Sequence, residues 1–186
     1  MKRRSFIISS VAAGLMPALP AIAKRNGRQA IGSKGVFVAN GKDRFNGEKH
    51  FGGASPNDLK VSTSDTDGGF CAFESIGNAK MGPPLHIHHE QDELFMVKEG
   101  EFTIQVGSDT FKLKPGDTLL APRKVPHAFV QTSEGTSKLM VLFQPAGKME
   151  EFFIAMGEIK GPPDRAVFQK LFQDHGMEIV GPPLQG

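Results

Sequence analysis

The sequence has no tryptophan, no tyrosine and a single cysteine among its 186 residues. The lone cysteine excludes a framework of intrachain disulfides. The absence of tyrosine excludes a tyrosine acid, base or radical from any mechanism. All the aromatic side chains are the fifteen phenylalanines, so an internal cavity would be dry and poor in hydroxyl groups. We interpret Cys71, which stands in an apolar strand-like stretch, as a small core residue rather than a reactive thiol.

The first 23 residues have the composition of an export signal. Three basic residues at positions 2–4 precede an uncharged stretch that ends in Ala21-Ile22-Ala23, a pattern that signal peptidases cleave. The paired arginines resemble a twin-arginine signal, which would place the protein in a bacterial periplasm. An uncleaved membrane anchor is the alternative, because the length nearly suffices to span a bilayer. Pro17 and Pro20 argue against that alternative.

The rest of the chain carries little net charge. The whole chain is formally +2, and its first 23 residues hold three basic and no acidic residues, so the remainder is −1. The sequence therefore gives no reason to expect nucleic-acid binding. After removal of the signal we expect no stable association with a membrane, and a small molecule as the binding partner.

Short strands with turns between them dominate the chain up to Pro145. Many of the strands alternate apolar and polar residues, and Gly, Pro and Asp residues separate them. Many short strands without intervening helices indicate an all-β antiparallel barrel or sandwich. The predicted strands are Val36–Ala39, Leu59–Thr63, Phe70–Ile76, Glu93–Lys98, Phe102–Val106, Thr110–Leu113, Thr118–Ala121, Ala128–Thr132 and Ser137–Phe143.

Two helices are predicted after Pro145. Apolar residues recur at helical spacing from Met149 to Met156 and again from Val167 to Phe172, with Asp164 as a possible N-cap. Each helix offers one apolar face, which could pack against the barrel or narrow the entrance to a site. We therefore divide the chain into a signal at 1–23, an N-terminal arm with edge strands at 24–58, a barrel core at 59–146 and a C-terminal helical extension at 147–186.

Three histidines and one glutamate are the candidate functional centre. His86 and His88 are two residues apart, so in a strand both side chains point to the same face. Glu93 opens the next strand, and a hairpin would return it beside them. His127 begins a later apolar strand. Imidazole and carboxylate groups bind divalent transition metals, and four ligands leave positions open for a substrate. The other histidines, His50, His89 and His175, are interpreted as solvated side chains.

The spacing of these residues resembles the two motifs of the cupin family. His86-x-His88, four residues, Glu93, six residues and Gly100 match the first motif. Gly116, Pro122 and His127 match the second, and fifteen residues separate Gly100 from Gly116, as in compact bacterial cupins. Three positions depart from the pattern, and none of them is a ligand position: Gly82 lies two residues closer to the first motif than usual, Lys124 replaces a glycine, and Gln131 replaces an asparagine.

The resemblance implies a single jelly-roll-like β-barrel, often dimeric, with a divalent metal inside. It implies that His86, His88, Glu93 and His127 hold one metal ion per chain, which could be Fe, Mn, Ni, Co, Cu or Zn. Within the cupins the chain is similar to small quercetin-dioxygenase-like proteins. That implies a dioxygenase acting on an enol or a flavonol, with Glu93 as the catalytic base. Two alternatives stay open: an exported binding protein without turnover, and an oxygen-independent isomerase or hydrolase.

Overall fold

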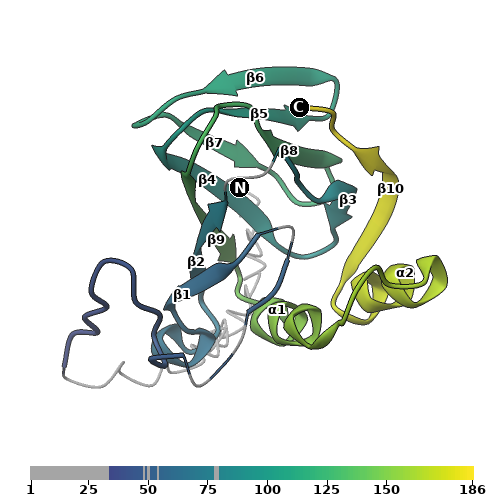
Figure 1. Cartoon of the computed structure of the whole chain (residues 1–186). Helices are drawn as coiled ribbons and strands as arrows, with labels where there is room; N and C mark the ends of the chain where they lie inside the picture. Colours follow the sequence, from purple (N-terminus) through teal and green to yellow (C-terminus); the bar gives the residue numbers. More distant parts are fainter. Residues whose placement is uncertain (1–33, 48, 50, 54, 78–79) are drawn as a thin grey trace, which may run out of the picture.

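Two antiparallel sheets of five strands face each other in this computed structural model, and two helices lie at one end of them (Figure 1). The structure describes residues 34–47, 49, 51–53, 55–77 and 80–186. The predicted signal and His50 lie outside these residues. The first sheet has the order β1-β2-β9-β4-β7 and the second the order β10-β3-β8-β5-β6. The predicted all-β barrel with two C-terminal helices is confirmed.

Most strands are five to eight residues long, as the alternating sequence pattern predicts. In β9, for example, Leu139, Val141 and Phe143 are buried between the sheets while Lys138 and Met140 lie on the outer face. The strands are β1 (Asn57–Val61), β2 (Cys71–Gly77), β3 (Pro84–His88), β4 (Asp92–Glu99), β5 (Phe102–Val106), β6 (Asp109–Leu113), β7 (Thr118–Ala121), β8 (His127–Gln131), β9 (Ser137–Gln144) and β10 (Met177–Pro183).

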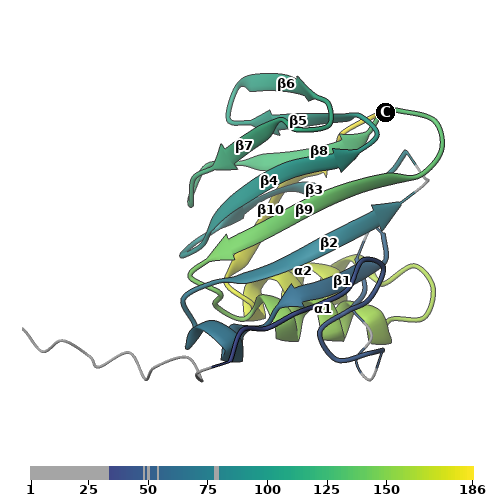
Figure 2. The same cartoon turned by 90° about the vertical axis from the view of Figure 1, so that its left-hand side faces the viewer.

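The two helices, α1 (Met149–Glu158) and α2 (Arg165–Asp174), follow the predicted apolar stripes. Asp164 caps α2 as expected, because its carboxylate accepts a hydrogen bond of 2.8 Å from the amide of Ala166. A rotated view places both helices at the end of the sheets opposite β6 (Figure 2). No helix in the described residues is long and apolar enough to cross a membrane.

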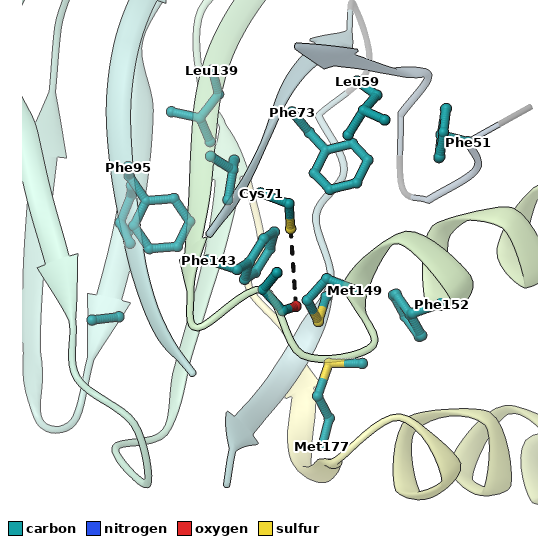
Figure 3. Packing of buried hydrophobic residues seen from close by; sticks show 14 of the residues in the cluster. Phe51, Leu59, Cys71, Phe73, Phe95, Leu139, Phe143, Met149, Phe152 and Met177 are labelled. Carbon is teal, nitrogen blue, oxygen red and sulfur yellow. Dashed lines mark hydrogen bonds between the residues drawn. The ribbon is translucent and has the colours of Figure 1, made fainter. Parts of the chain in front are cut away.

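Phenylalanines fill the space between the first sheet and the helices (Figure 3). Phe73 from β2 packs against Phe153 from α1, with ring centroids 4.6 Å apart. Cys71 is fully buried beside them, and its Sγ lies 3.9 Å from the carbonyl oxygen of Ala146. Burial raises the pKa of this thiol to about 12, so it is a protonated core residue at neutral pH.

Two parts of the sequence interpretation need correction. The stretch predicted as a strand at Val36–Ala39 is not one; Phe37 in it is 89% exposed, and no described strand pairs with it. Four consecutive apolar residues cannot make a strand without a neighbouring strand to pair with. Conversely, the C-terminal extension is not wholly helical, because β10 returns to the second sheet and pairs with β3. The interpretation of the helical stripes overlooked this strand.

Candidate metal centre

The structure brings together the four residues that the sequence singled out. One potential ligand atom from each of His86, His88, Glu93 and His127 lies within 4.8 Å of the others. All four side chains are buried, and they come from β3, β4 and β8. This cluster of imidazoles and one carboxylate could hold a metal ion.

The second sheet places two of the histidines directly opposite each other. β3 and β8 are antiparallel neighbours, and His86 is the register partner of His127. Their ring centroids are 4.6 Å apart. Gly82 leads the chain into β3 so close to β8 that a Cβ atom would come within 1.7 Å of the carbonyl oxygen of Phe129. A residue with a side chain could not occupy this position without moving the backbone of one of the two segments.

Glu93 reaches the histidines from the opposite sheet, not through a hairpin. We expected β3 and β4 to form a hairpin, but β3 belongs to the second sheet and β4 to the first. The connection between them crosses from one sheet to the other, and the amide of His89 donates to the carbonyl of Gly176 on the way. The cluster therefore forms between the two sheets, and its geometry depends on how the sheets pack.

Lys124 shows why a glycine is usual at its position. Its φ is +65°, in the left-handed region that glycine adopts without strain. In that conformation its amide donates a 2.7 Å hydrogen bond to the carbonyl of His88. The turn before β8 is thereby tied to the residue that carries one of the candidate ligands.

Backbone carbonyls fix the orientation of two of the imidazole rings. The Nδ1 of His86 lies 2.8 Å from the carbonyl oxygen of Pro84, and the Nδ1 of His127 lies 2.8 Å from that of Val125. A carbonyl oxygen can only accept, so each Nδ1 must carry the hydrogen. The Nε2 of each ring is then left to face the cluster, as in histidines that bind metals through Nε2.

Glu93 and His127 are in hydrogen-bond contact within the cluster. Glu93 Oε2 lies 2.8 Å from His127 Nε2. Burial opposes charge on both groups, yet their contact prevails: it holds the pKa of Glu93 well below its usual range and raises that of His127. The Nε2 atom of His127, which faces Glu93, is also the atom through which this ring could bind a metal.

The other two imidazoles of the cluster, His86 and His88, are also buried. Burial, followed by the proximity of the other two imidazoles, lowers the pKa of His86 to about 3, so that ring is neutral at neutral pH. His88 Nε2 lies 3.2 Å from Glu93 Oε2, and neither nitrogen of this buried ring forms a hydrogen bond with another described residue. A buried imidazole without partners is costly, and a metal ion would satisfy it. The four residues fit a divalent transition metal.

The other histidines in the described residues stay outside the cluster. His89 is partly buried and follows β3 on the opposite side from His86 and His88. His175 is also partly buried rather than fully solvated: its Nδ1 lies 2.7 Å from the carbonyl oxygen of Leu171, and its ring packs edge-on against Phe152. It caps the end of α2, which is a structural role.

A cavity of about 570 Å³ adjoins the cluster, and His86, His88 and Glu93 form part of its wall. A volume of this size suits a small organic ligand. Most of the remaining wall is apolar, and no Lys, Arg or Asp side chain of the described residues contributes to it. Its aromatic members, all phenylalanines, are Phe73, Phe129, Phe143, Phe152, Phe153, Phe168 and Phe172.

The C-terminal segment contributes part of the wall of this cavity. Phe152 and Phe172 from the two helices pack edge-on against each other, and Phe172 also contacts the His86 ring with centroids 5.7 Å apart. β10 holds α2 in place, because Met177 and Ile179 pair with His88 and His86 in β3. The short alternating run after Gly176 was the sequence signal for this strand.

Comparisons with known proteins agree with the fold and the motifs. Residues 74–143 match the family model described as a cupin domain. A protein of Bacillus subtilis named quercetin 2,3-dioxygenase is 28% identical over 112 residues, which are 60% of this chain and 33% of that protein. An uncharacterized protein of Methanocaldococcus jannaschii is 27% identical over 67 residues, 36% of this chain and 54% of its own. The chain thus spans about a third and about half of these curated relatives.

Among solved structures, that of KdgF from a Halomonas species is similar with a TM-score of 0.44 and 23% identity, over 48% of this chain and 77% of the other. The motif residues, the two facing sheets and the matching domain model point to one family. Residues 74–143 of this chain form a cupin domain.

Proposed function

We propose that this protein is a metal-dependent dioxygenase that acts on a small, uncharged, aromatic enol such as a flavonol. The observation that carries the proposal is the junction of a His₃Glu cluster with an apolar, phenylalanine-walled cavity. The similarity to a quercetin 2,3-dioxygenase over a third of that protein supports the choice of reaction.

The cavity wall favours a neutral ligand over an anionic one. A carboxylate or phosphate that enters an apolar cavity needs a cationic partner to offset its lost hydration. In the part of the chain that the structure describes, no Lys or Arg side chain lines the cavity, and Glu93 adds negative charge at the cluster. Phenylalanine rings, in contrast, can stack on a flat aromatic ligand and exclude water from its surface.

The chain's own residues have distinct roles in this proposal. His86, His88 and His127 would hold the metal with Glu93, and a bound redox-active metal would supply Lewis acidity and electron-transfer chemistry toward dioxygen. Glu93 is the one carboxylate of the cluster and faces the cavity, so it can accept the proton of an enol hydroxyl that enters. The edge-on contact of Phe172 with His86 places an apolar side chain beside the reacting end, where it would exclude water.

Oxygen consumption tests the proposal. Protein loaded separately with Fe, Mn, Ni, Co, Cu or Zn would be mixed with a panel of flavonols and β-diketones in an oxygen electrode. We expect consumption with at least one redox-active metal and loss of it in His86→Ala. His89→Ala is the matched control, because His89 neighbours the cluster without joining it.

Two other outcomes would overturn the dioxygenase. Tight retention of the flavonol, recovered unchanged by mass spectrometry, would identify a binding protein instead. Conversion of the compound in the strict absence of oxygen would identify an isomerase or hydrolase. Export to the periplasm and dimer formation remain predictions from the sequence.

A further inference from the structure

We propose that the cavity has a second polar end, formed by Asn57 and Ser75, that binds a hydroxyl group on the far side of the ligand from the metal. This inference rests on the proposed function, which places one end of the ligand at the cluster. It adds a specificity-determining contact: the preferred ligand is long, apolar along its body and polar at both ends.

Asn57 and Ser75 lie side by side on the inner face of the first sheet. They are register partners in β1 and β2, and both line the cavity. Ser75 is 8% exposed, so its side chain faces the cavity rather than the outer surface. The next inward pair along these strands is Leu59 and Phe73, which is wholly apolar. The polar pair therefore stands out on an apolar inner face.

The hydrogen bonds of this pair leave one acceptor and one hydroxyl available. Asn57 Nδ2 donates to the carbonyl oxygens of Gly52, at 2.8 Å, and Ser55, at 3.0 Å, so both amide hydrogens are engaged. Among the described residues, the side-chain hydrogen bonds of this pair are the two that Asn57 Nδ2 donates, so Asn57 Oδ1 and Ser75 Oγ form none. A ligand hydroxyl could donate to one of these oxygens and accept from the serine.

The strand register sets the spacing between the two polar ends. Glu93 and Cys71 are both register partners of Phe143, so they mark the cluster's row across the first sheet. Ser75 lies four residues further along β2 than Cys71, which is about 13 Å at a rise of about 3.3 Å per residue. Because β9 lies between β2 and β4, Ser75 is also about 10 Å across the sheet from Glu93, so their Cα atoms are about 16 Å apart. Phe73 lies between the two rows and lines the cavity. A flat molecule of two or three fused or linked rings fits this description.

Binding measured without oxygen tests the second polar end separately from turnover. The probes are unsubstituted flavonol and two derivatives with one added hydroxyl, on the phenyl ring or on the benzo ring. The chain has no Trp or Tyr, so flavonol fluorescence can be followed with little protein background. We expect one of the derivatives to bind about 10-fold more tightly than flavonol, as one good hydrogen bond allows.

Ser75→Ala should remove that preference and leave the affinity for unsubstituted flavonol within about 2-fold, since only the hydrogen bond is lost. Ser75→Thr, which keeps a hydroxyl, should retain the preference. Ser64→Ala is the control, because Ser64 is exposed and does not line the cavity. If Ser75→Ala failed to fold, the wild-type comparison of the three probes and the Ser75→Thr variant would still decide.

A wild-type protein that does not distinguish the probes, or binds none of them, overturns the second polar end. So does an undiminished preference in Ser75→Ala. A preference that depends on Ser75 without any oxygen consumption would retain the polar end and remove the dioxygenase. Oxygen consumption without such a preference would retain the dioxygenase and remove the second polar end.

Discussion

The two walls of the site come from parts of the chain that supply different things. β3, β4 and β8 supply all four residues of the cluster, and each of these residues is placed by its own strand and by turn contacts. The helices α1 and α2 with β10 supply no member of the cluster, yet they contribute much of the apolar wall. The residues that could hold a metal and those that form the apolar wall thus come from different elements, which meet where Phe172 contacts His86.

The largest expected effect is loss of metal from the cluster. Replacing His86 or His127 by Ala removes one of four ligands and should lower the metal content from about one equivalent per chain to near zero, with an affinity loss of at least about 100-fold. Elemental analysis after gel filtration measures this, and circular dichroism checks that the barrel still folds. His89→Ala is the control. Full metal content in both variants would remove the proposed site.

Removing an aromatic side chain from the helical wall should act on stability and ligand binding but not on the metal. Phe172 is 3% exposed and contacts Phe152, Phe168 and His86. Phe172→Ala should cost about 3 kcal/mol in the free energy of unfolding, measured by urea denaturation, and weaken flavonol binding. Metal content should stay near that of the wild type.

Val167→Ala provides the matched control on the same helix. Val167 is 59% exposed, so its truncation should change the stability by less than about 0.5 kcal/mol. Loss of metal in Phe172→Ala at unchanged fold would show that the two walls are coupled, against the expectation above.

A side chain at Gly82 should lower both the stability and the metal affinity, because this glycine allows the chain entering β3 to lie close to β8. The added Cβ of Gly82→Ala would meet the Phe129 carbonyl, so the backbone must shift. We expect a loss of about 2 kcal/mol in stability and weaker metal binding, since His86 and His127 pair across the same two strands. Gly35→Ala, where a Cβ meets nothing within 4 Å, should be nearly neutral in both measurements.

The smallest effect is expected at Lys124, where a substitution should stabilise the protein. Lys124→Gly relieves a left-handed conformation that costs a residue with a side chain about 1 kcal/mol, partly offset by the greater freedom of glycine in the unfolded chain. A rise of about 0.5 kcal/mol in unfolding free energy is expected. Lys114→Gly, at an exposed position with ordinary φ, should not stabilise. Equal effects of the two changes would refute the strain argument.

The difference between the cluster and the cavity wall also explains which features could be predicted from the sequence. The cluster was predictable, because His86 and His88 share a strand face, and Glu93 and His127 begin later strands at motif spacing. The assignment of β3 and β4 to different sheets was not predictable, because spacing along the chain does not show whether two successive strands join the same sheet. Glu93 in fact crosses to the facing sheet.

The wall of the cavity was harder to predict, since it depends on contacts between distant segments. The helical stripe predicted an apolar face around Phe172, but only the pairing of β10 with β3 turns that face toward His86. Ser75 looked like an ordinary strand residue, and its place in the cavity follows from the packing of both sheets and the helices. At Val36–Ala39 the local pattern favoured a strand, but no neighbouring strand was present among the described residues.

Anomalous X-ray diffraction from crystals of the protein, purified without chelator and loaded with a redox-active divalent metal, would test the central claim most directly. The account predicts one strong anomalous peak per chain, within bonding distance of side-chain atoms from His86, His88, Glu93 and His127, at the end of the phenylalanine-walled cavity. A peak elsewhere, or no peak with these four side chains still in contact with one another, would contradict it.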